Sequence, residues 1–408
     1  MPIWRRGTID RHAVNAVKEL LINRSVMYED GCRKIVRKVE IGCPQGSVSS
    51  PLIWKIGLND LLEKLTEAGV EVIAFADDIA IVIEESHKQR FKNLAKKTFQ
   101  IIREWSKRSN VKLNLAKTVC MWIGRKSWDE ELKCGRTTLE ICEQIKYLGL
   151  ILMHNLKWDG HLTYLEEKNG KLIRLINAVI ALTGNLDLNN KMTIYRQVYL
   201  TTLLYCHEIW AAALNNRQKD QLKSLQRKAI LAMTGAFSST NNSKLLDLIG
   251  VLEVNEEIAY QNEIKGEDHE ARKRIKADRL AAQRERLQGD RYEPMFNEEL
   301  VRKIRRKETF WFLTGHGPFA TYSFRFNKNE TTNCRLCRLV DETPRHLLHD
   351  CASFKENVER NSTDLVFSKR NVEKLLLDCI LYRRRETSLH SLVLPLVNTA
   401  AVDTWTKV

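Results

Sequence analysis

Hydrophobic and polar positions in the first forty residues change from a helical to a strand pattern. Between Asp10 and Ile22 the apolar residues recur every three or four positions, which predicts an amphipathic helix with Asp10 as its N-cap. Residues 26–40 then carry strand-forming side chains, interrupted by Asp30 and Gly31. Because Asp and Gly are typical turn residues, this second stretch is expected to form a pair of strands.

A glycine-bounded loop follows, from Gly42 to Gly46, and it leads into a second helical pattern. Ser49 or Ser50 is suited to cap this helix, and Pro51 suits its first turn. The apolar stripe of the predicted helix consists of Trp54, Leu58, Leu61, Leu62 and Leu65.

Two adjacent carboxylates, Asp77 and Asp78, lie between two β-rich stretches, residues 70–75 and 79–83. This pattern predicts a hairpin with acids at its tip. Aspartate is also a common turn residue, so a purely structural role is the alternative. The flanking strands are nearly all apolar, which predicts burial of both faces, and buried carboxylates require cations or a metal. Hard oxygen ligands of this kind suit Mg²⁺ or Mn²⁺.

The remaining pattern is mainly helical. Residues 91–105 show an apolar stripe at helical spacing, and residues 158–250 show three more such stripes, which are expected to form core rather than recognition surfaces. The middle one comprises Ile194, Val198, Tyr205 and Ile209, and the last is expected to be capped by Asn216 and to end before Gly235. Residues 255–307 are rich in both charge signs, which predicts a solvated helical connector.

The charge of the chain favours an acidic partner. The 408 residues have a formal net charge of +15, which suits nucleic acid. Between residues 86 and 127 the charged side chains are all Lys or Arg except Glu104. The basic side chains of the predicted helix in this stretch form either a solvated outer face or a surface that attracts RNA phosphates.

Composition also limits the compartment. The ten cysteines are scattered and lack the density of a disulfide scaffold. The N-terminus shows no signal peptide, and no apolar stretch reaches the roughly 18 residues that a membrane span requires. We therefore expect a protein of the nucleus or cytoplasm without a membrane partner.

Four residues near the C-terminus have the spacing of a metal site. Cys334 and Cys337 are separated by two residues, and His346 and Cys351 follow. Two thiolates from one tight turn, closed by a histidine and a third thiolate, match tetrahedral Zn²⁺ coordination. His349 is an alternative ligand, and chance clustering of reduced core thiols is the structural alternative.

The sequence G-C-P-Q-G-S, followed about thirty residues later by F-A-D-D, resembles the palm of reverse transcriptases, most closely those of animal non-LTR (LINE-type) retrotransposons. The resemblance implies that Asp77 and Asp78 hold catalytic metals. It implies that Gln45 and Gly46 line the pocket for the incoming nucleotide and the template base. The chain departs from the family at Ser49 and Ser50, where a bulky apolar residue and glycine are usual.

The resemblance extends beyond the palm motifs. It places Lys117 near the nucleotide phosphates and gives Tyr147, Leu148 and Gly149 the position of the hairpin that grips the primer end. The stretch L-T-G-H-G-P-F at 313–319, together with the Cys/His cluster, resembles the C-terminus of the same retrotransposon proteins, where the zinc knuckle is thought to assist nucleic-acid handling.

Together these features predict an α+β fold with a partial polymerase palm, an antiparallel sheet with packed helices, at residues 1–155. An all-α thumb is expected at 156–250, a charged connector at 251–312 and a zinc-knuckle region at 313–408. The implied activity is RNA-directed DNA synthesis from an RNA template, a DNA primer and dNTPs. The oligomeric state is not indicated.

One element of the family pattern is missing. A further metal-bridging aspartate should precede the first helix, and Asp10 is unsuited because it opens that helix. The cationic fingers are missing as well. We therefore expect part of a longer polyprotein, or a truncated or decayed copy, that is inactive alone. The alternative is a non-catalytic nucleic-acid-binding remnant.

Overall fold

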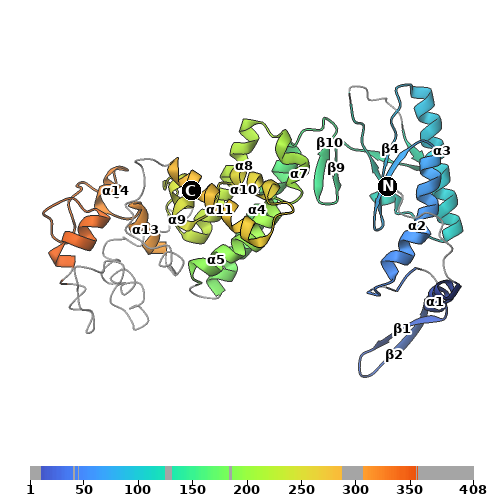
Figure 1. Cartoon of the computed structure of the whole chain (residues 1–408), viewed down its shortest axis with the longest axis horizontal. Helices are drawn as coiled ribbons and strands as arrows, with labels where there is room; N and C mark the ends of the chain where they lie inside the picture. Colours follow the sequence, from blue (N-terminus) through green and yellow to red (C-terminus); the bar gives the residue numbers. More distant parts are fainter. Residues whose placement is uncertain are drawn as a thin grey trace. The chain divides into compact units, whose positions relative to one another are not determined.

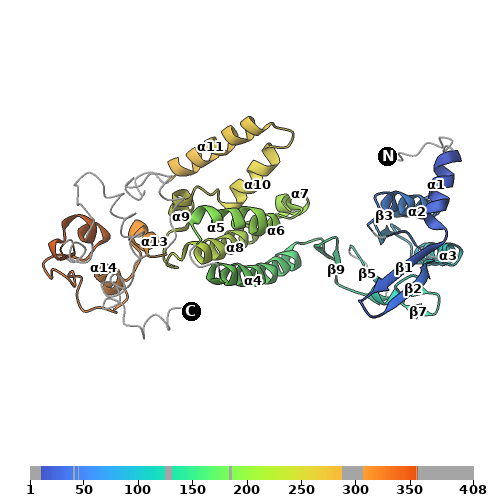
Figure 2. The ribbon, with the colours of Figure 1, turned by 90° about the horizontal axis from the view of Figure 1, so that it is seen from below.

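A computed structural model describes residues 11–39, 42–44, 46–124, 131–182, 186–286, 307–354 and 356 (Figures 1 and 2). The chain divides into two compact units. The first comprises residues 1–146 and 153–156, and the second comprises residues 147–152 and 157–408. Helices accompanied by small sheets make this an α+β fold, as the sequence predicts.

The first unit begins with helix α1 (Arg11–Leu21) and a hairpin of strands β1 (Arg24–Glu29) and β2 (Lys34–Val39). Asn23 adopts a left-handed conformation, with φ of 56°, where the helix gives way to the hairpin. The two strands are antiparallel, with Arg24 opposite Val39 and Glu29 opposite Lys34. This agrees with the predicted helix and strand pair, although Asp10 lies outside the described residues.

The centre of the first unit is a second hairpin covered by two helices. Strands β3 (Glu71–Phe75) and β4 (Asp78–Val82) are antiparallel and follow helix α2 (Ser50–Glu67). Helix α3 (Lys88–Ser109) packs against α2, and the indole Nε1 of Trp105 donates to the carbonyl oxygen of Gly57 at 3.3 Å. Leu61 and Leu65 are fully buried in this core.

Burial of the β3–β4 hairpin differs from the prediction. Val72, Ala74, Ile79, Ile81 and Ile83 pack on the core of α2 and α3. The opposite face is open, with Ile73 and Phe75 exposed by 59% and 63%. The expectation of burial on both faces is wrong for the described residues, because β3 and β4 pair only with each other there and helices contact only one face.

The remaining strands of the described chain are short and form three two-stranded sheets. They are β5 (Val119–Cys120) with β8 (Glu140–Ile141), β6 (Lys133–Cys134) with β7 (Thr137–Thr138), and β9 (Gln144–Tyr147) with β10 (Leu150–Met153). The β5–β8 pair is parallel, and a 3₁₀ turn at Leu115–Lys117 precedes it.

The second unit is helical. Its helices are α4 (Asp159–Leu182), α5 (Leu188–Ile194), α6 (Thr201–Leu203), α7 (His207–Trp210), α8 (Asn216–Thr234), α9 (Asn242–Ile249), α10 (Val254–Glu263), α11 (His269–Glu285), α13 (Lys307–Thr314) and α14 (Ala320–Phe324). Further turns are π-helical at Tyr195–Leu200 and His346–Asp350 and 3₁₀-helical at Ala211–Ala213. Trp210, Tyr195 and Tyr199 are fully buried in its core.

Helix α8 organises this core. It starts with a capping box in which the side chain of Asn215 accepts from Gln218 and that of Gln218 accepts from Asn215. The cap is therefore Asn215 and not Asn216, one residue from the prediction. The helix ends at Gly235, whose φ of 66° is the expected left-handed conformation.

The charged residues after the core are attached to it. Gln226 of α8 donates to the carbonyl oxygen of Leu252 at 2.8 Å and accepts from the backbone of Val254 at 2.9 Å. Gln283 of α11 donates to the carbonyl oxygen of Val251. Helix α10 is thus packed on α8, and α11 contacts α9 and α10. The expected domain boundary at 251–312 stays a prediction. Among the described helices, none is long and apolar enough to cross a membrane.

Candidate functional site

The two adjacent acids lie at the turn of the β3–β4 hairpin. Phe75 pairs with Asp78, so Ala76 and Asp77 form the two-residue connection. Both carboxylates are exposed. Asp78 shares its face of the hairpin with Phe75 and Ile73, which is the face that the helices leave open. The turn therefore presents two carboxylates beside an accessible apolar surface.

The conformation of this turn is held from helix α2. Ala76 has a φ of 52°, in the left-handed region that costs a non-glycine residue energy. The indole Nε1 of Trp54 donates to the carbonyl oxygen of Ala76 at 2.7 Å, across 22 residues of sequence. This bond fixes the peptide immediately before Asp77. In the sequence Trp54 is only one member of an apolar stripe, because the hydrophobic pattern does not indicate that its N–H donates a hydrogen bond.

The glycine-bounded loop is attached to the same end of α2. The hydroxyl of Ser50 donates to the carbonyl oxygen of Pro44 at 2.6 Å, and the guanidinium of Arg24 donates to that of Gly42 at 2.7 Å. Gly42 and Gly46 have φ of 80° and 83°. Gln45 lies outside the described residues.

Loop and acids are thereby brought to one helix. Ser50 holds the loop and Trp54 holds the acid turn, and residues four apart lie on the same side of a helix. Ser50 is one of the two positions where the chain departs from the expected motif, and it is the residue of α2 that bonds the loop.

Among the described residues, neither the predicted phosphate contact nor a third metal ligand is joined to the acids. Lys117 is exposed at the end of its 3₁₀ turn, and no hydrogen bond or ion pair links it to Asp77 or Asp78 among the described residues. Within the same residues, no third Asp, Glu, His or Cys joins these two acids in a metal-sized group.

The turn between β9 and β10 carries the predicted primer-gripping residues. Leu148 and Gly149 have φ of 46° and 86°. The hydroxyl of Tyr205 donates to the carbonyl oxygen of Leu148 at 3.1 Å, and its ring would lie 3.1 Å from a Cβ at Gly149. Gly149 therefore permits close approach by Tyr205. The hydroxyl of Tyr147 is buried, and no described residue forms a hydrogen bond with it.

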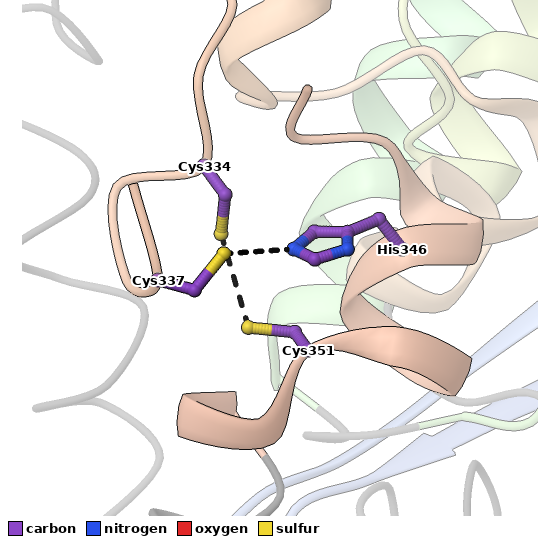
Figure 3. A group of neighbouring side chains, drawn as sticks. All are labelled: Cys334, Cys337, His346 and Cys351. Atoms are coloured by element: carbon purple, nitrogen blue, oxygen red, sulfur yellow. Dashed lines mark hydrogen bonds between the residues drawn. The ribbon is translucent and has the colours of Figure 1, made fainter. Parts of the chain in front are cut away.

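The Cys/His cluster is gathered at one point (Figure 3). One ligand atom from each of Cys334, Cys337, His346 and Cys351 lies within 4.8 Å of all the others. The Sγ atoms of Cys334 and Cys351 are 3.9 Å apart, and Sγ of Cys337 is 3.3 Å from Nε2 of His346. Tetrahedral Zn²⁺ with Zn–S bonds of about 2.3 Å separates its sulfur ligands by roughly 3.8 Å. The four side chains therefore fit zinc.

Backbone turns prearrange these ligands. The backbone N–H of Cys334 donates to the carbonyl oxygen of Val340 at 2.7 Å. The backbone N–H of Arg338 donates to the carbonyl oxygen of Cys334 at 2.8 Å. A π-helical turn then carries His346, and the N–H of Cys351 donates to its carbonyl oxygen at 2.8 Å. The side chain of His349, the alternative ligand, lies outside the described residues.

The electrostatic environment differs among the thiols. A backbone hydrogen bond from Leu339 is the main cause that lowers the pKa of Cys337 to about 7. Burial raises the pKa of Cys351 to about 11. Since a metal binds the thiolate, the ion itself has to offset the burial of Cys351.

A buried ion pair that the sequence did not reveal stabilises the cluster. Glu342 is completely buried and accepts hydrogen bonds from the backbone N–H of Ala320 at 3.0 Å and from the backbone and guanidinium of Arg335. Arg335 also donates to the carbonyl oxygen of Pro318. Burial alone would raise the pKa of Glu342, but the bonds from Arg335 outweigh it and lower the pKa. The pair therefore fixes the first thiolate turn to the start of α14.

Aromatic residues attach this region to the helical core. Phe237 contacts Trp311 and Tyr322 edge-on, with ring centres 5.3 and 5.6 Å apart. The indole Nε1 of Trp311 donates to the carbonyl oxygen of Gly235 at 3.0 Å. The Cys/His cluster is therefore packed against the end of α8.

Comparison with known proteins gives a consistent result. Residues 4–152 match the family described as reverse transcriptase (RNA-dependent DNA polymerase). The chain is 24% identical over 383 residues to the retrovirus-related Pol polyprotein from type-1 retrotransposable element R1 of Bradysia coprophila, covering 85% of this chain and 38% of that protein. A second such polyprotein, from Nasonia vitripennis, is 24% identical over 77% of this chain and 86% of its own length.

A third relative is the RNA-directed DNA polymerase from mobile element jockey of Drosophila funebris. It is 27% identical over 213 residues, which are 51% of this chain and 23% of that protein. The chain therefore spans only 38% and 23% of the lengths of the first and third of these relatives.

Proposed function

The chain is a homologue of the RNA-directed DNA polymerases of non-LTR retrotransposons, and we propose that it is the part of such an enzyme that carries palm, thumb and zinc knuckle. Its reaction would be the extension of a DNA primer on an RNA template with dNTPs. The observation that carries the proposal is that Ser50 and Trp54 fasten the glycine loop and the acid turn to one end of α2.

In this proposal Asp77 and Asp78 hold Mg²⁺ or Mn²⁺. When bound, such an ion polarises phosphoryl oxygens and neutralises charge that develops during phosphoryl transfer. The exposed position of both carboxylates leaves them accessible to a nucleotide, and Trp54 keeps the turn in the conformation that presents them.

Other residues take positioning roles. Gln45 and Gly46 would line the nucleotide and template pocket, and Lys117 would approach the nucleotide phosphates. Tyr147, Leu148 and Gly149 would contact the primer end. The helical residues 156–250 would form the thumb, and the natural compartment would be the nucleus or cytoplasm.

We further propose that Cys334, Cys337, His346 and Cys351 bind one structural Zn²⁺. The support is the four-fold convergence of thiol and imidazole atoms and their tetrahedral spacing. Because all four positions are filled by protein, this ion would stabilise the fold rather than act on substrate.

Primer extension tests the polymerase proposal. The full chain is incubated with an RNA template, a DNA primer, dNTPs and Mg²⁺, and compared with Asp78→Asn. Glu71→Gln is the control, because Glu71 lies on the same exposed face of the hairpin. Wild type and control should extend the primer, and Asp78→Asn should not. Equal background from all three proteins would reject catalysis by this chain.

A second candidate function is binding of nucleic acid without catalysis. It is favoured by the pair of acids without a third carboxylate in the described residues and by the net charge of +15. Filter binding of RNA across salt concentrations tests it. A flat dependence of log K on log salt would contradict phosphate-driven binding.

A further inference from the structure

The hairpin at residues 24–39, which we name the β-ribbon, consists of β1, β2 and their turn. Among the described residues its strands pair only with each other, and its side chains are exposed except at Arg24 and Val39 near its base. A lone two-stranded hairpin is marginally stable in water. Its exposed side chains are therefore accessible to a binding partner.

One face of the β-ribbon combines an aromatic ring with aliphatic and cationic groups. Tyr28 lies opposite Ile35, and Val26 lies opposite Arg37. Directly opposed residues and those two positions along the strand point to the same side, so these four share a face. Tyr28, Val26 and Ile35 are exposed by 61%, 61% and 50%.

The β-ribbon is also basic and its cations are available. Arg33, Lys34, Arg37 and Lys38 are exposed, and none of them has an acidic partner among the described residues. Of its two acids, Asp30 is engaged by the turn, where its Oδ1 accepts from the backbone of Cys32 and Arg33. Unpaired cations on a narrow hairpin attract a polyanion.

We propose that the Tyr28 face of the β-ribbon binds single-stranded nucleic acid. An unstacked base would lie on Tyr28 between Val26 and Ile35, and Arg37 would contact the adjacent phosphate or stack on a base. The proposal rests on the proposed function only in taking nucleic acid as the partner.

The chemistry of the face favours a single strand over a duplex. Reading base pairs in a groove requires side chains such as Asn, Gln or Arg aimed at base edges. The Tyr28 face has no amide side chain and, of the arginines, Arg37 is the one beside Val26, so most of this face is aromatic or aliphatic. Such a surface suits the flat side of an unpaired base.

The base of the β-ribbon connects it to the glycine loop. The guanidinium of Arg24 donates to the carbonyl oxygen of Leu21 at 3.2 Å and to that of Gly42 at 2.7 Å. Arg24 thus joins the end of α1, the first strand and the start of the loop. A strand bound along the Tyr28 face would run toward the loop that carries Gly46.

Binding of a fluorescein-labelled 20-nucleotide oligo(U) RNA, measured by anisotropy with the full chain, tests the proposal. Tyr28→Leu should weaken binding roughly 5- to 100-fold, the range found for loss of base stacking. Tyr28→Phe should bind like wild type, because the ring is kept. Arg37→Gln should weaken binding and reduce the salt slope by about 0.7.

Lys34→Gln is the matched control, because it removes the same charge from the other face of the β-ribbon. It should have a smaller effect than Arg37→Gln. Equal effects of the two changes, or unchanged binding by Tyr28→Leu, would overturn the proposal. So would a wild-type dimer that Tyr28→Leu makes monomeric, because the face would then be a protein interface.

Circular dichroism of each variant confirms that the fold is intact. The outcome is separate from that of the polymerase proposal. Oligo(U) binding by the β-ribbon requires neither Asp78 nor primer extension, so a chain without polymerase activity can still pass or fail this test.

Discussion

The two candidate metal sites of this chain differ in almost every physical respect. Asp77 and Asp78 are exposed at a turn, and no third ligand joins them among the described residues. Cys334 and Cys351 are buried, with 0% and 1% exposure, and two more ligands converge on them. The first site is open and has two oxygen ligands, whereas the second is closed and complete.

In the proposed roles, the difference follows from what each ion would have to do. A structural ion stabilises a fold only if protein ligands fill its coordination, so its ligands must be gathered and desolvated. A catalytic ion must leave positions for substrate, so its carboxylates stay accessible. The two exposed carboxylates of the acid turn leave coordination positions of an ion open, whereas the Cys/His group offers four protein ligands.

The strongest test of this contrast is loss of a zinc ligand. Structural zinc provides roughly 10–16 kcal/mol of apparent binding free energy in small domains. Cys334→Ser removes one of four ligands, and we expect the purified protein to lose stoichiometric zinc and to melt at lower temperature. Metal analysis and thermal denaturation measure this. Cys32→Ser, at an exposed thiol, should retain one zinc per chain; loss of zinc there as well would contradict the assignment.

The next largest effect concerns the buried pair beside the zinc ligands. Glu342→Ala removes the carboxylate that the guanidinium of Arg335 bonds, and removal of one member of a buried pair costs about 3–5 kcal/mol. Because the Arg335 side chain is 28% exposed, we expect about 3 kcal/mol. Denaturant unfolding of the zinc-loaded protein measures it. Glu330→Gln, an exposed acid of the same region, should be neutral; an equal loss there would refute a specific role for the pair.

A smaller effect, the dependence of stability on pH, is expected from a buried histidine of the helical core. His161 is 1% exposed, and burial lowers its pKa from 6.5 to about 4. Its Nδ1 accepts from the backbone of Ile151 at 3.4 Å, and its ring contacts Trp158 and Trp210 edge-on. The folded protein therefore keeps this imidazole neutral.

The sign of the pH effect follows. Below pH 6.5 His161 binds a proton in the unfolded chain but not in the folded one. The free energy of unfolding therefore falls as the pH decreases from about 6.5 to 4. The loss is at most about 3 kcal/mol. Unfolding in urea at pH 7 and pH 5 measures it, with His161→Phe as the comparison. If that variant keeps the full pH dependence of wild type, His161 is not the source.

Local sequence signals identified most of the elements around both sites. The period of apolar residues predicted α2 and α3, and the Asp pair between two β-rich stretches predicted the hairpin of β3 and β4. The spacing of Cys334, Cys337, His346 and Cys351 grouped four residues whose side chains the structure also brings together, while their role as metal ligands stays a prediction. These signals are local, so they can be interpreted without knowledge of the tertiary fold.

Features set by tertiary packing could not be predicted in this way. The stripe through Val198 and Tyr205 was expected in the core, yet these residues are 43% and 46% exposed. The buried residues are Tyr195 and Tyr199, because the hydroxyl of Tyr199 donates to Leu225 and that of Tyr195 accepts from Gln226. The set with Val198 and Tyr205 and the set with Tyr195 and Tyr199 both have helical spacing. Which set is buried therefore depends on the position of the partner helix α8.

The smallest predicted effect tests whether the acid turn is preset. Trp54→Phe keeps an aromatic ring in the core but removes the N–H that bonds Ala76. A hydrogen bond of this kind contributes about 1 kcal/mol, and the left-handed Ala76 would be free to relax. We expect weaker Mn²⁺ binding by Asp77 and Asp78, roughly 5-fold, with nearly unchanged thermal stability. Electron paramagnetic resonance of Mn²⁺ measures the affinity. Leu62→Met, a conservative change in the same helix, is the control. If both variants bind Mn²⁺ like wild type, the hydrogen bond from Trp54 is not needed for binding. The conformation of the acid turn would then be set by the bound ion rather than by the fold.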